Sequence, residues 1–301
     1  FAMEFVQKTI GQMLDEIVDR YPDKKALVHL ERGFRCNYRR LGFDAEQIAR
    51  GMIALGLRKG DRIALWAPNI PEWIIAFLGI AAIGAIIVPV DPGASVDDLR
   101  FILEQSECRA VIMAAGTESR EYPKTIGKVR KELPLLCQII IVSGEIFADT
   151  IPWTELFRRA ETVTRERFQS AVTEVCPEEP VAIMYTSGTT GRPKGVVLNH
   201  LGLLNKSIFS NERQGITHCD RVCLFFPLFH MFGNTCIALS TLIQGAALIM
   251  PAVAFDPSTI LSAIRKEKCT AIYGSPSMFM ALLENPGSRK DDWASVKRGV
   301  L

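Results

Sequence analysis

Short apolar runs alternate with stretches of helical periodicity along most of this 301-residue chain. The apolar runs have the length of strands and lie at 62–67, 86–90, 110–113, 138–142, 181–186, 222–226, 246–250 and 270–273. Strands that are apolar throughout and separated by helices favour parallel sheets that are covered on both faces. The sequence therefore predicts an α/β fold, with two doubly wound, mostly parallel sheet lobes and helices on both faces.

Helical segments and turns complete this pattern. Apolar spacing and capping residues predict helices over 39–55, 95–107, 118–133, 200–211, 232–243, 257–267 and 276–284. Two short strands, 26–30 and 34–38, are expected on either side of a turn. The irregular, charged stretch 143–180 is the best candidate for a boundary, which divides a domain of residues 3–301 into approximate lobes of 10–175 and 176–301.

Composition narrows the class of protein. Lys and Arg number 35 against 33 Asp and Glu, so the net charge of +2 argues against a nucleic-acid partner. Hydrophobic residues make up 48% of the chain and charged residues 23%, which is typical of a globular protein. The eight cysteines are too sparse for a disulfide scaffold, and Cys223 and Cys236 lie in apolar stretches. We interpret the cysteines as small core residues in a reducing compartment.

One segment resembles a membrane span without being predicted as one. Residues 73–90 carry no charge and reach the lower length limit of a membrane-crossing helix. Gly79, Gly84 and Pro89 interrupt the run, which favours a buried helix followed by a buried strand. The sequence also shows no signal peptide, so we predict no transmembrane segment and a soluble, cytoplasmic protein.

The segment 181–198 carries the most chemistry. An apolar strand enters a loop, a second apolar strand leaves it, and the loop holds three glycines and four hydroxyls (Gly188, Gly191, Gly195, Thr186, Ser187, Thr189 and Thr190). Glycines bring backbone N–H groups close to an anion, and Lys194 adds a positive charge that suits phosphate. The loop lacks the spacing of a Walker A motif and leads into a strand instead of a helix. A polyphosphate-binding loop is favoured over a plain polar turn.

The loop resembles the phosphate-binding signature of the acyl-adenylate-forming superfamily, which includes acyl- and aryl-CoA synthetases, firefly luciferase and peptide-synthetase adenylation domains. Further segments are similar to the same family: 226–233 to its P-L-F-H-x-x-G motif, 273–279 to its V-P-T-M-F motif with Ser275 in place of Val, and 60–62 and 69–73 to its N-terminal lobe. The resemblance covers the chain from about residue 10 onward.

The resemblance implies an ATP-dependent acid–CoA ligase. A carboxylate would attack the α-phosphate of ATP, and coenzyme A would then displace AMP from the acyl-adenylate. The residues implied for the β- and γ-phosphates are Thr186, Ser187, Gly188, Thr189, Thr190, Gly191 and Lys194. Thr186 is also implied to approach Mg²⁺, while Lys194 and His230 are the implied catalytic residues. His230, Phe232 and Gly233 would border the pocket for a fatty or aryl acid.

The sequence departs from the family's pattern, and alternatives to the ligase function remain open. The family's adenine, ribose and C-terminal lysine segments do not occur before Leu301. We therefore expect a truncated N-terminal portion that turns over poorly or not at all by itself. A peptide-synthetase-type adenylation domain and a non-catalytic nucleotide- or partner-binding scaffold are the alternatives. We assign His200 no role beyond a helix start, and we predict no zinc site at Cys219, Cys223 and Cys236. The sequence does not indicate the oligomeric state.

Overall fold

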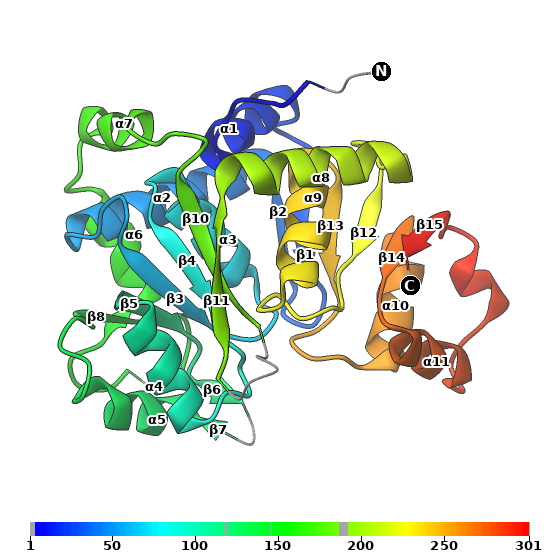
Figure 1. Ribbon diagram of the computed structural model, residues 1–301. Helices are drawn as coiled ribbons and strands as arrows, with labels where there is room; N and C mark the ends of the chain where they lie inside the picture. The colour runs from blue at the N-terminus through cyan, green and yellow to red at the C-terminus, as the bar shows by residue number, and fades with distance from the viewer. Residues whose placement is uncertain (1–3, 118–119, 145, 187–191, 301) are drawn as a thin grey trace. The chain divides into compact units, whose positions relative to one another are not determined.

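The computed structural model describes residues 4–117, 120–144, 146–186 and 192–300. The chain divides into two compact units (Figure 1). The first unit comprises residues 1–12, 43–68 and 72–203, and the second comprises 13–42, 69–71 and 204–301. Each unit contains its own sheet.

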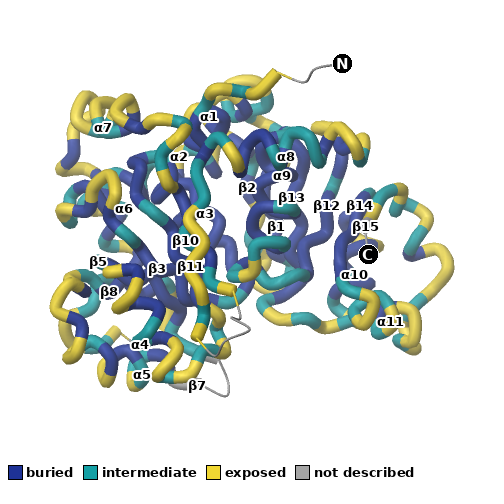
Figure 2. Tube along the Cα trace, in the orientation of Figure 1, coloured by how far each residue is buried: buried dark blue, intermediate teal, exposed yellow. Residues whose placement is uncertain are grey.

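The sheet of the first unit has the strand order β11-β10-β4-β3-β5-β8-β9. Its strands are β3 (Arg62–Trp66), β4 (Ile86–Pro89), β5 (Cys108–Met113), β8 (Gln138–Ile141), β9 (Ile151–Pro152), β10 (Pro180–Thr186) and β11 (Lys194–Asn199). All neighbouring strands pair in parallel except β10 and β11, which are antiparallel. The central strands are buried while β11 at the edge is largely exposed (Figure 2). Burial on both faces explains why the central strands are continuously apolar.

The sheet of the second unit has the strand order β15-β14-β12-β13-β1-β2. Its strands are β1 (Lys25–His29), β2 (Phe34–Asn37), β12 (Arg221–Cys223), β13 (Ala247–Met250), β14 (Ala271–Tyr273) and β15 (Arg298–Val300). The pairs are parallel except for the β1–β2 hairpin. A further short antiparallel pair joins β6 (Gly116–Thr117) to β7 (Arg120–Glu121).

Helices flank both sheets, and local sequence signals explain where several of them begin. The helices are α1 (Ile10–Arg20), α2 (Tyr38–Ala54), α3 (Pro71–Ala82), α4 (Val96–Gln105), α5 (Tyr122–Arg130), α6 (Trp153–Ala160), α7 (Arg165–Thr173), α8 (His200–Gln214), η1 (Phe232–Leu239), α9 (Ser240–Ile243), α10 (Pro257–Glu267), α11 (Pro276–Glu284) and η2 (Lys290–Trp293). Ser95, Asp256 and Ser275 each accept a backbone N–H of the first turn that follows them, as helix N-caps do.

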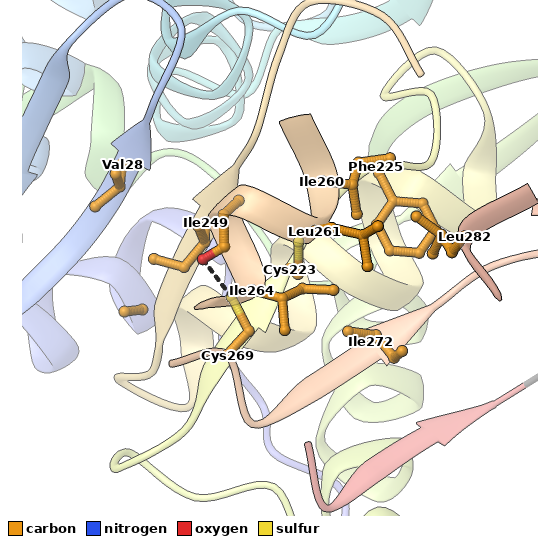
Figure 3. Close-up of a cluster of buried hydrophobic side chains, with 12 residues drawn as sticks. Val28, Cys223, Phe225, Ile249, Ile260, Leu261, Ile264, Cys269, Ile272 and Leu282 are labelled. Carbon is orange, nitrogen blue, oxygen red and sulfur yellow. Dashed lines mark hydrogen bonds between the residues drawn. The ribbon is translucent and has the colours of Figure 1, made fainter. Parts of the chain in front are cut away.

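The core of the second unit forms where α10 packs on the sheet. Ile260, Leu261 and Ile264 of α10 lie among buried side chains from the strands (Figure 3). Cys223 of β12 and Cys269 are fully buried in the same cluster. Their burial raises the pKa of the Cys223 thiol well above its usual value. These two cysteines behave as small apolar core residues.

The predicted fold class is confirmed, since the structure has two mostly parallel sheets flanked by helices. Two local expectations need correction. Residues 232–239 form a π-helix instead of an α-helix, and Cys137, Cys176 and Cys219 are exposed instead of packed in the core. All eight cysteines are free.

The compact units also group the chain differently from the two predicted lobes. The stretch 143–180 forms β9, α6, α7 and the start of β10, and it lies inside the first unit. The N-terminal strands β1 and β2 join the second unit because β1 pairs in parallel with β13. Among the described residues, no helix has the length and apolar character needed to cross a membrane.

Candidate functional site

One candidate functional segment is the β10–β11 hairpin in the first unit. Thr186 ends β10, Lys194 begins β11, and the two residues pair directly across the hairpin. The Thr186 hydroxyl donates a long hydrogen bond of 3.5 Å to the carbonyl oxygen of Lys194. This pairing holds the predicted magnesium-approaching hydroxyl and the predicted catalytic ammonium at the two ends of one loop. Both residues are exposed.

The predicted phosphate-binding residues between these ends are Ser187, Gly188, Thr189, Thr190 and Gly191. They lie outside the described residues, so their roles stay predictions. The described end of the loop begins at Arg192, whose guanidinium lies 5.4 Å from the centre of the Phe101 ring. This cation–π contact attaches the loop end to helix α4.

The hairpin is closely packed around Gly195. A Cβ atom there would lie 3.0 Å from the Ile183 Cγ2 atom and 3.2 Å from Tyr185 Cζ. The Tyr185 ring in turn meets the Phe101 ring edge-on at 6.4 Å between centres. Burial raises the pKa of the Tyr185 hydroxyl, so this group stays neutral beside the loop. The aromatic contacts fix the strand ends from which the loop projects.

A separate candidate segment follows β12 in the second unit. The backbone N–H of His230 donates to the carbonyl oxygen of Pro227 at 3.2 Å, so residues 227–230 form a turn. His230 is exposed, and its Nδ1 accepts the N–H of Phe232 at 3.1 Å. Because Nδ1 is an acceptor, the neutral ring carries its proton on Nε2. His230 therefore presents an Nε2–H donor on a ring of fixed orientation.

The π-helix η1 begins at Phe232, two residues after His230, and brings backbone segments very close together. A Cβ atom on Gly233 would lie 2.1 Å from the Pro227 carbonyl oxygen, which no side chain tolerates. The Asn234 side chain donates to the carbonyl oxygen of Leu228 at 3.0 Å. Position 233 therefore requires glycine for close backbone packing. π-Helical turns recur at functional sites.

Aromatic rings surround the His230 segment. The Phe226 ring lies 5.3 Å from His230 and 5.1 Å from Phe232, and Phe232 lies 6.5 Å from Tyr273. Burial, and then the charge of Asp220, raise the pKa of Tyr273 to about 12. Tyr273 ends β14 and belongs to a motif noted in the sequence, but sequence reasoning gave it no role in the site. Its contact with Phe232 is tertiary and leaves no local signal.

Each candidate segment lies at the carboxyl end of parallel strands in the sheet of its own unit. Thr186 ends β10, which is parallel to β4, and the His230 segment follows β12, which is parallel to β13 and β14. Ligands of open α/β sheets bind at this edge. The topology therefore places the predicted residues of each unit where ligand binding is expected.

Among the described residues, other side chains that could bind a metal do not gather into a metal centre. Across the part of the chain that the structure describes, no group of three or more His, Cys, Asp and Glu side chains could hold a metal ion. His200 begins α8 as expected and is fully buried, with Nδ1 accepting the N–H of Ile10 at 3.2 Å. This contact gives His200 a structural role in the first unit.

Comparisons with known proteins agree with these observations. The sequence profile of the AMP-binding enzyme family matches residues 14–301. The chain is 32% identical to the acyl-CoA synthetase YngI of Bacillus subtilis (strain 168), covering 99% of this chain and 56% of that protein. It is 31% identical to the mitochondrial medium-chain acyl-CoA ligase ACSF2 of Danio rerio, covering 97% and 50% respectively. The chain thus spans about half the length of these curated relatives.

Solved structures share the fold. The N-terminal domain of FACL13 from Mycobacterium tuberculosis matches 93% of this chain and 66% of its own, with 26% identity and a TM-score of 0.75. The anthranilate CoA ligase AuaEII in complex with anthranoyl-AMP matches 93% of this chain and 52% of its own. Its TM-score is 0.82 at 24% identity, so this likeness concerns the fold alone.

Proposed function

This chain belongs to the AMP-binding enzyme family, and we propose that it activates a carboxylic acid with ATP and serves its transfer to coenzyme A. The observation that carries the proposal is the β10–β11 hairpin, which sets Thr186 against Lys194 at the two ends of the signature loop. The P-L-F-H turn, with its fixed His230 ring, supports the same reaction. Relatives named as acyl-CoA synthetases and ligases support a ligase over a scaffold or a peptide-synthetase domain.

The proposed reaction proceeds in two displacements. A carboxylate oxygen of the acid attacks the α-phosphorus of ATP, the bond to the β-phosphate oxygen breaks, and pyrophosphate leaves. The thiol sulfur of coenzyme A then attacks the acyl carbon, and AMP departs with the electron pair of the broken bond. Such chemistry depends mostly on positioning and on neutralising the charge of the phosphoryl oxygens.

Residues of this chain supply that neutralisation in the proposal. The Lys194 ammonium offsets negative charge on the phosphates, and the loop hydroxyls donate hydrogen bonds to them. The Nε2–H of His230 donates a hydrogen bond to an oxygen of the acid or of the adenylate. The turn and the Phe232 N–H keep that donor in one orientation.

Magnesium fits the residues present if the phosphates supply most of its ligands. Mg²⁺ prefers oxygen ligands and commonly keeps waters and substrate phosphates in its shell, with one or two protein ligands. Among the described residues of the loop, Thr186 offers an exposed hydroxyl oxygen to such an ion. When bound, the ion would neutralise phosphate charge beside Lys194.

We propose a fatty or aryl acid as the substrate. The half-buried rings of Phe226 and Phe232 at the His230 turn offer an apolar surface that suits either class. The name of the medium-chain ligase relative makes medium-chain fatty acids the first class to assay. The cytoplasmic location remains a prediction. Both the location and the oligomeric state can be measured.

Acid-dependent ATP–pyrophosphate exchange by the complete gene product tests the proposal. Acids from acetate to long-chain and aryl acids are compared, and we expect exchange with one class. Lys194→Ala should reduce that exchange by about 100-fold or more, as expected for removal of a charge-stabilising group. Arg192→Ala is the matched control, because its guanidinium is engaged with Phe101, and we expect a smaller loss.

The outcomes separate the candidates. Exchange that requires Lys194, followed by acyl transfer to coenzyme A, supports the ligase. Exchange without transfer to coenzyme A would favour the adenylation-domain alternative. A protein that binds ATP but exchanges with no acid would contradict both and favour a scaffold.

A further inference from the structure

One buried asparagine, Asn69, holds the segment that leads to His230. Asn69 lies between β3 and α3, belongs to the second unit, and is 7% exposed. Its Nδ2 donates to the carbonyl oxygen of Phe226 at 3.0 Å. Its Oδ1 accepts the backbone N–H of Leu228 at 2.8 Å. The single side-chain amide therefore binds the main chain on both sides of Pro227.

The two hydrogen bonds from the Asn69 side chain take the place of strand pairing at residues 226–228. β12 ends at Cys223, and Pro227 has no N–H to donate. Buried backbone groups that find no partner are costly, so the groups on either side of Pro227 need a partner from elsewhere. Asn69 supplies both a donor and an acceptor, and the 157-residue separation from Phe226 makes this a purely tertiary contact.

The backbone of Asn69 is itself held by a hydrogen bond from His29. His29, fully buried at the end of β1, accepts the N–H of Arg32 on Nδ1 at 3.3 Å. Its Nε2 therefore carries the proton and donates to the carbonyl oxygen of Asn69 at 3.0 Å. The backbone of Asn69 is thus anchored to the strand that pairs with β13.

Residues 226–228, the segment that Asn69 holds, lead into the turn that carries His230. The Pro227 carbonyl, between the two groups bound by Asn69, accepts the N–H of His230 and closes the turn. From the other side, Asn234 binds the Leu228 carbonyl, and Gly233 lets η1 approach Pro227. Movement of residues 226–228 would move the turn that carries the His230 ring.

We propose that Asn69 is a positioning residue for His230 in the reaction. Asn69 reaches the chemistry through the main chain of residues 226–228 and touches no reacting atom. The proposal rests on the proposed function of His230. It predicts that Asn69 affects turnover through His230, while binding of the phosphates depends on the hairpin of the first unit.

A double-mutant cycle on the complete gene product tests this role. Asn69→Ala should lower kcat of acid-dependent exchange by about tenfold to 100-fold, the scale of a small misplacement of a catalytic group. The KM for ATP should change less than about twofold if the effect is confined to the His230 turn. In the His230→Ala background, Asn69→Ala should have almost no further effect on kcat, because residues that act as a unit are not additive.

The control is Asn211→Ala, which removes an equally buried asparagine elsewhere in the second unit. Asn211 donates to the Ser240 carbonyl at 2.7 Å and to the Gln244 side chain at 3.4 Å, both outside residues 226–230. We expect it to lower stability without the kcat loss of Asn69→Ala. Equal kcat losses in the two variants, or additive effects of Asn69→Ala and His230→Ala, would overturn the positioning role.

Amide hydrogen exchange tests whether Asn69 holds residues 226–228, and it does not depend on a measurement of enzyme activity. The Leu228 N–H should exchange about tenfold faster in Asn69→Ala, while β12 amides stay unchanged. Unchanged exchange at Leu228 would refute the proposal even if the enzyme is active. Absence of activity in the unsubstituted protein would instead refute the proposed function, so the two failures are distinguishable.

Discussion

Acidification should destabilise the first unit through a single buried histidine. His200 is fully buried, its Nδ1 accepts the N–H of Ile10, and Nε2 has no hydrogen-bond partner within the described part of the chain. Burial lowers the pKa of His200 to about 4, and the nearby Glu179 carboxylate offsets part of that fall. The unfolded chain therefore binds a proton at a higher pH than the folded protein.

The sign and size of the effect follow from proton linkage. The His200 pKa is 6.5 in the reference state and about 4 when folded, so stability is intact above pH 6.5 and falls with pH between these values. At pH 5 the loss of unfolding free energy is about 2 kcal/mol, and at pH 4 it is about 3 kcal/mol. This is a large fraction of a typical domain's stability.

Urea unfolding between pH 7.5 and 4.5 measures this loss. Tryptophan fluorescence suits the first unit, which contains Trp66, Trp73 and Trp153. His200→Gln keeps an acceptor for Ile10 but does not titrate, so its free energy of unfolding should fall less than that of the unsubstituted protein. His218→Gln is the control, because His218 is exposed. Parallel pH curves for His200→Gln and the unsubstituted protein would refute the reasoning.

Two further substitutions test the close packing of the second unit. Gly233→Ala should cost about 1–3 kcal/mol and reduce acid-dependent exchange, because its Cβ would lie 2.1 Å from the Pro227 carbonyl oxygen. Gly127→Ala is its control in a helix with open space around the added carbon, and an unchanged Gly233→Ala protein would contradict the geometry. Ile264→Ala should cost about 2–5 kcal/mol in thermal or urea unfolding, since Ile264 is fully buried in the α10 core. Met280→Ala, at an exposed position, should stay within about 0.5 kcal/mol, and equal losses would argue against the observed core.

Local signals predicted most individual elements because their causes are local. α10 spans Pro257–Glu267 as expected, since Asp256 caps its first turn and its apolar residues recur at helical spacing. α11 likewise follows the Ser275 cap and Pro276. In both cases the residues that start the helix lie next to it in the sequence.

Departures from the expectations arise where backbone contacts between neighbouring segments decide the element and side-chain periodicity does not reveal them. The apolar pattern of 232–243 predicted an ordinary helix, but close approach to the Pro227 backbone accompanies a π-helix over Phe232–Leu239. The expected helix over 118–133 is shortened to Tyr122–Arg130, after the β6–β7 pair. A periodicity of about four residues does not separate an α-helix from a π-helix.

The candidate site residues also differ in whether short motifs or tertiary contacts reveal their roles. The phosphate-loop residues and His230 could be predicted from sequence because they lie in short contiguous motifs, and their roles stay predictions. The chemistry predicted for the loop needs glycines, hydroxyls and a cation close together. Asn69 and Tyr273 also stand in such motifs. Their contacts, however, join Asn69 to Phe226 and Leu228, and Tyr273 to Phe232.

The sequence by itself determined the alternation of strands and helices, because that alternation depends on neighbours along the chain. For the same reason it could predict phosphate-binding residues, whose role stays a prediction. The tertiary structure alone decided that β1 joins the sheet of β13, and that Asn69 clamps the segment before His230. Strand order and buried side-chain hydrogen bonds depend on which distant groups satisfy one another away from water. No local pattern encodes that choice of partners.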